Sequence, residues 1–156
     1  MPVNTKISEV MSTDPVVIGG DLPIADAADR MAELGVSALP VVDHDRRLIG
    51  LLRDDDLIVS EARVHAPRFL NILGATIPLP GEMKHLEAEL RKVAGSTAGD
   101  LMEPNPSVTH EDDSLEDAAT LMHESSVNHL PVVDGAGKVV GMLTRADIVR
   151  FIARTT

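Results

Sequence analysis

The chain has 156 residues, of which 44% are hydrophobic and 25% are charged, so it can form a soluble domain with one ordinary core. Its 25 acidic against 14 Lys and Arg residues give a formal charge of −11, which makes nucleic acids and anionic membranes poor partners. It has no cysteine, which excludes disulfides and Cys-based zinc sites, and only two aromatic residues, so a bound base would have to lie against aliphatic side chains.

The N-terminal residues MPVNTKISEV lack the charged and then apolar pattern of a secretion signal. No apolar run approaches the about 18 residues that a membrane-spanning helix needs. We therefore expect a cytoplasmic protein with no membrane partner and no nucleic-acid partner.

The first part of the chain alternates between strand and helix patterns. Val16-Val17-Ile18 is a short β-branched run, typical of a strand. Apolar residues then recur at three- and four-residue spacing, which predicts a helix that buries them: Ile24, Ala27, Ala28, Met31 and Leu34. Two further strands are predicted over residues 39–42 and 48–52, separated by a polar turn and followed by a closing helix.

Residues 64–97 follow a different pattern. Residues 68–74, ending in Gly74, predict a short helix, and Pro78 and Pro80-Gly81 break the chain after it. Residues 82–94 carry apolar residues on one face and predict an amphipathic helix. We expect a helical insert that packs on the rest of the protein. Whether its apolar face meets its own chain or a second subunit stays open.

The last part of the chain repeats the first. Aligning Pro15 with Pro106 gives an offset of 106 − 15 = 91, which holds without a gap from residue 10 to residue 63. The identical pairs include Met11/Met102, Asp21/Asp112, Ala27/Ala118, Met31/Met122, Leu39/Leu130, Gly50/Gly141 and Asp56/Asp147. Ser114 is the predicted N-cap of the repeated helix. Such a match indicates an internal duplication, so we expect an α+β fold of tandem β-α-β-β-α repeats that pack on one another as a pseudo-two-fold module.

Both repeats carry hydrophobic-Pro-Val-Val-Asp, at residues 39–43 and 130–134, a glycine in the next strand, and an Asp after it, which in repeat two completes Thr/Ser-x-x-Asp. In that order they resemble the CBS domain, over residues 7–63 and 98–154. Two such repeats form a CBS pair, or Bateman module, and here they look like a stand-alone module. The resemblance implies a binding cleft between the repeats for AMP, ADP, ATP or a related adenosyl compound. It also implies a homodimer that regulates another protein.

The resemblance implies roles for particular residues. Asp147 and Asp56 would accept hydrogen bonds from the ribose hydroxyls, and Thr144 and Arg145 would hold phosphate at a helix N-terminus. The base and phosphate would be lined by Val36, Ser37, Ala38 and Pro40 in repeat one, by Val127, Asn128, His129 and Pro131 in repeat two, and by Thr13, Val17, Pro104 and Val108 near the first strands. In this family the two halves of a site usually come from opposite repeats, which pairs Asp147 with residues 36–40.

Repeat one departs from the family pattern. Arg53 stands where repeat two has Thr144, and Asp54, Asp55 and Asp56 crowd one helix start. Three carboxylates suit the positive end of a helix dipole but oppose a bound phosphate. Arg53 either pairs with a phosphate or fills the site and pairs with Asp54 or Asp55. We expect one working site around Thr144 and Asp147, and one weak or altered site.

A simpler interpretation of Thr144 and Asp147 is an ordinary helix cap. Asp56 persists where the capping Thr does not, which favours a role for the Asp beyond the cap. His129 would contact phosphate or would be a polar residue at a strand edge. We expect no resident cofactor and no metal site, with Mg²⁺ entering only together with a nucleotide.

Catalysis finds no support in the sequence, which has no Walker loop, no Gly-x-Ser-x-Gly and no His-Glu-x-x-His. The expected function is therefore a non-enzymatic regulatory module that binds an adenine nucleotide and signals by conformational change. The alternatives are a structural or protein-interaction module with degenerate, empty sites, and an S-adenosylmethionine sensor.

Overall fold

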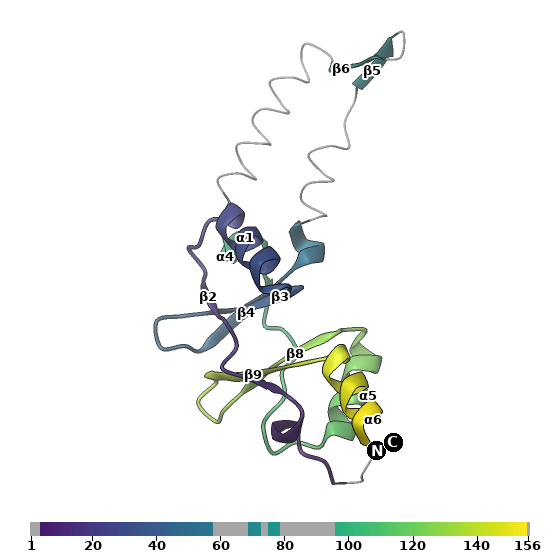
Figure 1. The fold of residues 1–156 in the computed structure, drawn as a ribbon. Helices are drawn as coiled ribbons and strands as arrows, with labels where there is room; N and C mark the ends of the chain where they lie inside the picture. The colour runs from purple at the N-terminus through teal and green to yellow at the C-terminus, as the bar shows by residue number, and fades with distance from the viewer. Residues whose placement is uncertain (1–3, 58–68, 73–74, 79–95, 156) are drawn as a thin grey trace.

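Two of the three β-sheets of the described residues, the four-stranded and the three-stranded one, lie between two groups of helices (Figure 1). The computed structural model describes residues 4–57, 69–72, 75–78 and 96–155. Their elements are the 3-10 helix η1 (Ile7–Glu9), the helices α1 (Ile24–Leu34), α4 (Ala98–Leu101), α5 (Leu115–Ser125) and α6 (Arg145–Thr155), and the strands β1 (Ser12–Thr13), β2 (Ile18–Gly19), β3 (Ala38–Val42), β4 (Leu48–Arg53), β5 (Phe69–Ile72), β6 (Ala75–Pro78), β7 (Glu103–Pro104), β8 (His129–Val133) and β9 (Val139–Thr144).

The duplication is visible element by element. Helices α1 and α5, strands β3 and β8, and strands β4 and β9 each start 91 residues apart, as 115 − 24 shows for the helices. Both central hairpins shift register at the same place, between Val41 and Val42 in one and between Val132 and Val133 in the other. The predicted α+β fold of two packed repeats is confirmed.

The helices begin and end where the sequence supplies caps. Ser114 accepts a hydrogen bond from the backbone N–H of Asp117 (3.0 Å), which confirms it as the N-cap of α5. Helix α1 ends at Gly35, whose φ of 64° lies in the left-handed region that glycine adopts without strain. Ser126 takes the same conformation at the end of α5.

The repeats exchange their first segments. One sheet has the strand order β2-β3-β4-β7 and the other β1-β9-β8, so β7 of the second repeat joins the first sheet and β1 of the first repeat joins the second. The cores follow this exchange, because Ile7 is buried in the cluster under α5 and Ala98 in the cluster under α1. Each core is therefore completed by the other repeat.

The two sheets also contact each other directly. Ala38 and Leu51 of the first sheet are buried with Met142 of the second. Val42 of the first sheet is buried with Val133 and Val139 of the second. With α1 and α4 on one outer side and α5 and α6 on the other, the arrangement is helix, sheet, sheet, helix (Figure 1). The space between the repeats is thus held by apolar packing on both sheets.

The glycine that both repeats carry in the second strand of their central hairpin marks the crossing of the exchanged segments. A Cβ added at Gly141 would lie 2.6 Å from Met11 Sδ and 2.9 Å from the backbone oxygen of Ser12. A Cβ at Gly50 would meet Met102 and, at 2.9 Å, the backbone oxygen of Glu103. A side chain at either position would push the exchanged strand off the sheet.

We predict that Gly141→Ala lowers the free energy of unfolding by about 1–3 kcal/mol, the usual range for overpacking. Urea denaturation measures the change. Gly135→Ala is the control, because a Cβ there meets nothing within 4 Å and no stability should be lost. Equal effects of the two variants would contradict the prediction.

The expected short helix over residues 68–74 is wrong. Phe69–Ile72 and Ala75–Pro78 form an antiparallel pair of strands, with Phe69 opposite Pro78 and Ile72 opposite Ala75. The β-branched residues Ile72, Thr76 and Ile77 favour strands, and cross-strand pairing exceeds the helix propensity of so short a segment. The predicted helix over residues 82–94 and the position of Gly74 lie outside the described residues.

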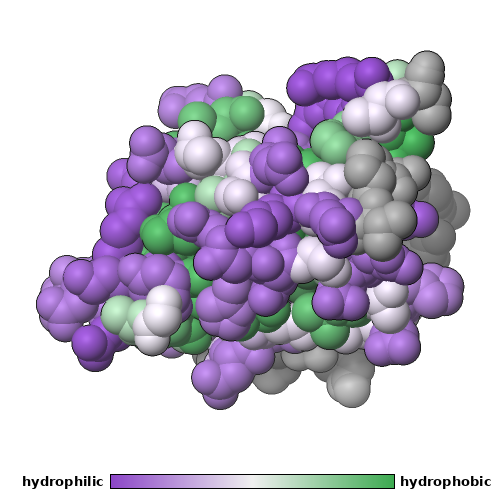
Figure 2. Space-filling model, turned by 90° about the horizontal axis from the view of Figure 1, so that it is seen from below, coloured by the Kyte–Doolittle hydropathy of each residue, from purple (hydrophilic) through white to green (hydrophobic). Residues whose placement is uncertain are grey.

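One face of the surface is mainly hydrophilic (Figure 2). Hydrophilic residues predominate on the face in Figure 2, with apolar residues in small patches between them. Among the described residues, no helix combines the length and the apolar character that crossing a membrane requires.

Candidate functional site

A cavity of about 920 Å³ lies between the two repeats. One wall is formed by residues 34–40 of the first repeat, which end α1 and begin β3. The opposite wall is formed by residues 144–147, Val149 and Arg150, which end β9 and begin α6. The cavity therefore brings together a largely apolar segment and the polar N-terminus of a helix.

Most of the predicted site residues line this cavity. They are Val36, Ser37, Ala38, Pro40, Asn128, His129, Thr144, Arg145 and Asp147. The structure places residues 36–40 and Asp147 in the lining of the same cavity, and their joint role in binding stays a prediction. Asn128 and His129 line this cavity as well. The reason is that His129 Nε2 lies 2.7 Å from Ser37 Oγ, a hydrogen bond across the contact between the repeats.

The remaining predicted residues lie outside the lining. Val17 and Val108 pack against the cluster between the sheets, and Pro131 is fully buried in β8. In the strand pairs, Thr13 is opposite Gly141 and Pro104 is opposite Gly50. The neighbouring residues Ser12 and Val16 line the cavity in place of Thr13 and Val17. Val127 lines a second cavity, of about 530 Å³, between α5 and α6. Arg53 and Asp56 pair with each other at the start of the helix in repeat one. Side chains alternate along a strand, so a one-residue error in the expected position moves a side chain to the other face.

Thr144 and Asp147 form a reciprocal cap at the start of α6. The backbone N–H of Thr144 donates to Asp147 Oδ2 (2.9 Å), and the backbone N–H of Asp147 donates to Thr144 Oγ1 (3.1 Å). In repeat one, the backbone N–H of Arg53 donates to Asp56 Oδ2 at the same distance. This bond needs no Thr, so the cap alone explains why Asp56 persists. The persistence of Asp56 therefore does not by itself require a further role, and a role of the Asp beyond the cap stays a prediction.

Asp147 has a second partner that sequence reasoning missed. Arg150, one turn further along α6, places Nη2 2.5 Å from Asp147 Oδ1. The Asp147 side chain is 7% exposed and that of Arg150 is 61% exposed, so a buried carboxylate is paired with a cation at the cavity mouth. The three-residue spacing on a helix is the signal that could have identified the pair.

Exposed apolar side chains gather at the same cavity. The described residues include six exposed large hydrophobic side chains, and four of them line it: Val16, Leu34, Val36 and Val149. Leu34 was expected on the buried face of α1 but is 46% exposed. Uncovered apolar groups concentrated in one concave site indicate a surface that a ligand or partner covers.

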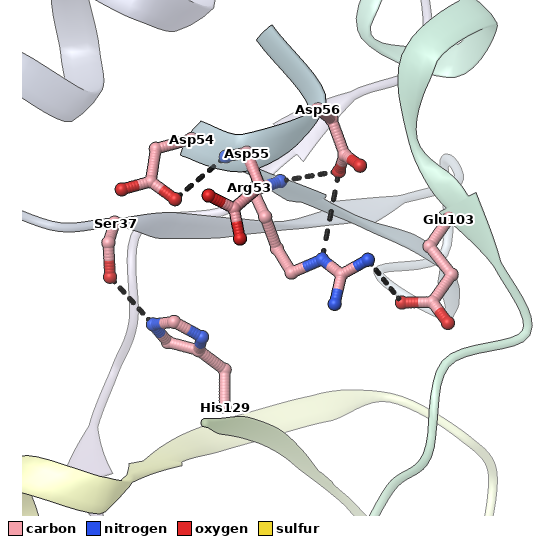
Figure 3. A network of polar contacts seen from close by, with 7 residues as sticks. All are labelled: Ser37, Arg53, Asp54, Asp55, Asp56, Glu103 and His129. Atoms are coloured by element: carbon pink, nitrogen blue, oxygen red, sulfur yellow. Dashed lines mark hydrogen bonds and ion pairs between the residues drawn. The ribbon is translucent and has the colours of Figure 1, made fainter. Parts of the chain in front are cut away.

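The equivalent helix start in repeat one carries a network of charged residues (Figure 3). Arg53 Nη2 lies 3.3 Å from Glu103 Oε2, and Arg53 Nε lies 3.8 Å from Asp56 Oδ2, an ion-pair distance too long for a hydrogen bond. The expected partners Asp54 and Asp55 are replaced by Asp56 and Glu103. Because β7 carries Glu103 across from the second repeat, Arg53 meets a carboxylate that its own repeat does not supply.

His129 lies between Ser37 and the charged network of repeat one. Its ring forms a hydrogen bond with Ser37, and the charges of Arg53, Asp54 and Asp55 act on it from the other side (Figure 3). Burial of the ring lowers the pKa of His129 below its ordinary value of 6.5. Asp54 and Asp55 act in the opposite direction, and Arg53 reinforces the effect of burial. The neutral form is therefore favoured in the folded chain.

We predict that His129 contributes stability that is present above pH 6.5 and lost as the pH falls below it. A base with a lowered pKa in the folded state binds its proton more readily when unfolded, so stability rises with pH through that window. The measurement is the difference in unfolding free energy between the protein and His129→Gln across pH 5 to 8. An NMR titration that gave His129 a pKa above 6.5 would contradict the prediction.

Within the part of the chain that the structure describes, no three His, Asp or Glu side chains are placed to hold a metal ion. In the cavity beside Asp147, the wall formed by repeat two carries hydroxyl, carboxylate and guanidinium groups, and the wall formed by repeat one carries mainly aliphatic groups. Such a set can bind a molecule that is apolar at one end and anionic at the other.

Comparison with known proteins agrees with this arrangement. The model of the CBS domain family matches residues 7–62 and 98–154, more than half of the chain. The chain belongs to the CBS domain family. The two matches make it a CBS pair, in which the cavity beside Asp147 is a cleft between CBS repeats.

The CBS pair resembles two chloroplastic CBS domain-containing proteins of Arabidopsis thaliana. It is 34% identical to CBSX1 over 128 residues and 33% identical to CBSX2 over 135 residues. These alignments cover 81% and 86% of this chain but 54% and 57% of the relatives, so the chain spans little more than half of their length. The crystal structure of CBSX2 in complex with AMP is 30% identical, with a TM-score of 0.74, and the match covers 96% of this chain and 97% of that one.

Proposed function

We propose that this CBS pair is a non-enzymatic regulatory module that binds an adenine nucleotide, foremost AMP, in the cleft beside Asp147. The observation that carries the proposal is the composition of that cleft. It sets exposed aliphatic side chains of the first repeat opposite Asp147, Arg145 and Arg150 of the second. Its volume of about 920 Å³ lies within the range of about 300–1,000 Å³ that small-molecule sites occupy.

Each part of a nucleotide has a partner in this cleft. The base can lie against Val16 and Val36, since aromatic stacking is not offered there. The ribose hydroxyls can donate to Asp147, and the phosphate can pair with the guanidinium groups of Arg145 and Arg150. The relative CBSX2 has been crystallised in complex with AMP, which supports AMP as the first candidate.

The regulatory part of the proposal rests on the two-sided wall of the cleft. A ligand that contacts residues 36–40 and the start of α6 interacts with both repeats at the same time. Its binding therefore favours one relative arrangement of the two repeats. In this proposal a cytoplasmic homodimer passes that change to a regulated partner protein. Mg²⁺ takes part only as the companion of a bound nucleotide.

Calorimetric titration of the nucleotide-stripped protein with AMP, ADP, ATP and S-adenosylmethionine tests the proposal. We expect saturable binding of AMP at one site per chain, because Arg53 at the equivalent position of repeat one is already paired with Asp56 and Glu103. Binding of S-adenosylmethionine alone would identify an adenosyl sensor of a different kind. Absence of binding by all four compounds would overturn the proposal in favour of an interaction module with empty sites.

A further inference from the structure

Both carboxylate oxygens of Asp147 are engaged in the structure. The backbone N–H of Thr144 donates to Oδ2, and the Arg150 guanidinium lies at Oδ1. The first bond belongs to the cap of α6, so breaking it would loosen the start of the helix. The second joins a 7% exposed carboxylate to a 61% exposed side chain, which is long enough to turn away without moving the backbone. Oδ1 is therefore the oxygen that a ribose can gain.

We propose that Arg150 makes this cleft select phosphorylated nucleosides over nucleosides, by leaving Asp147 for the phosphate when a nucleotide binds. This inference rests on the proposed nucleotide function and adds the residue that sets its specificity. Arg150 is a specificity-determining residue in this scheme, not a fixed part of the ribose site.

Asp147 Oδ1 must exchange the Arg150 guanidinium for a ribose hydroxyl when a ligand binds. A ribose hydroxyl that takes Oδ1 displaces the guanidinium, and the loss of a charge-assisted bond to a buried carboxylate is costly. A nucleoside has no anionic group with which the displaced guanidinium could pair. A nucleotide offers a phosphate, which a guanidinium binds with two parallel hydrogen bonds. The same cation thus opposes an unphosphorylated ligand and favours a phosphorylated one.

The asymmetry between the repeats supports this role. The offset of 91 residues assigns Val59 to the position of Arg150 and Asp54 to the position of Arg145. At these two positions a cation is therefore present only in repeat two, whose helix start lines the cavity, whereas the cap carboxylate is present in both repeats. In repeat one the guanidinium near the cap carboxylate belongs to Arg53, which precedes the helix and does not line that cavity.

The test compares AMP with adenosine by calorimetry on the whole chain. For Arg150→Met we expect AMP affinity to fall about tenfold to 100-fold, the effect of losing a hydrogen bond to a charged group. Adenosine affinity should stay the same or rise, because Asp147 Oδ1 is then open. Arg150→Lys, which keeps the charge but loses the fork, should lie between the two.

Arg154→Met is the matched control, since it removes the same charge from an exposed position on the same helix, outside the cleft lining. Both affinities should then change by no more than about twofold, as expected for a charge screened by salt. Equal weakening of AMP and adenosine by Arg150→Met would show that Arg150 merely supports the helix, and would overturn the inference. An unchanged AMP affinity would also overturn it. If the unmutated protein bound no AMP, the proposed function itself would fall.

Discussion

Replacing Asp147 with alanine is expected to weaken AMP binding about 30-fold to 100-fold. A carboxylate can accept hydrogen bonds from both ribose hydroxyls, and a bond to a charged group contributes more than one between neutral groups. Asp147 is 7% exposed and lines the cavity, so in the alanine variant water does not readily take over its hydrogen bonds to the ribose. Calorimetric titration of the stripped protein with AMP measures the change.

The duplication supplies a matched control in Asp56→Ala. Asp56 accepts the same backbone hydrogen bond at 2.9 Å, so each variant should lose about 1 kcal/mol of stability through its cap. Asp56 is paired with Arg53 and does not line the cavity beside Asp147, so AMP affinity should change by no more than about threefold in this variant. Equal losses of affinity in the two variants would show that Asp147 acts through folding and not through contact with the ligand.

Replacing Arg53 with methionine is expected to lower the free energy of unfolding by about 1–3 kcal/mol while AMP affinity stays nearly unchanged. Arg53 and Asp56 are 29% and 20% exposed, between a buried ion pair and a surface one. The variant leaves Asp56 and Glu103 near Asp54 and Asp55 with no cation in the network of Figure 3, so their repulsion is uncompensated. Urea denaturation at low and high salt measures the loss, which should shrink as salt screens the carboxylates.

Lys6→Met is the comparison for this prediction. Lys6 pairs with Asp112 at 3.6 Å with both side chains well exposed, and its removal should cost at most about 1 kcal/mol. In the Arg53→Met protein, the pKa of His129 should rise, because Arg53 is one of the groups that lower it. A loss of AMP binding with unchanged stability would instead assign Arg53 to a working phosphate site.

The repeat and the fold class could be predicted because they are properties of the local pattern. The ungapped offset of 91, the spacing of Ile24 to Leu34 and the Ser114 cap each specify a period or a terminus that the backbone must follow. The segment at residues 69–78 could not be predicted in the same way. Its apolar residues suit a helix or a strand, and the pairing of Phe69–Ile72 with Ala75–Pro78 selects the strand.

Much of the candidate site was also predictable, since residues 36–40 and Asp147 do line one cleft. The predictions that failed concern the partners of side chains whose neighbours are distant in the sequence. Glu103 reaches Arg53 because β7 crosses to the other sheet, and His129 reaches Ser37 across the contact of the repeats. Arg150 was missed because the family motif ends at Asp147 and says nothing of the next turn.

The sequence by itself determined that two copies of one β-α-β-β-α unit pack together in an acidic chain, with a capped helix after the last strand of each. Periodicity and caps are local, and each repeat carries its own. The tertiary structure alone decided that the copies exchange β1 and β7, that a cavity lies beside Asp147, and that Arg53 pairs with Glu103 of the other repeat. Those outcomes depend on which side chains a distant segment of the chain brings into contact. The local spacing of apolar residues carries no information on such contacts.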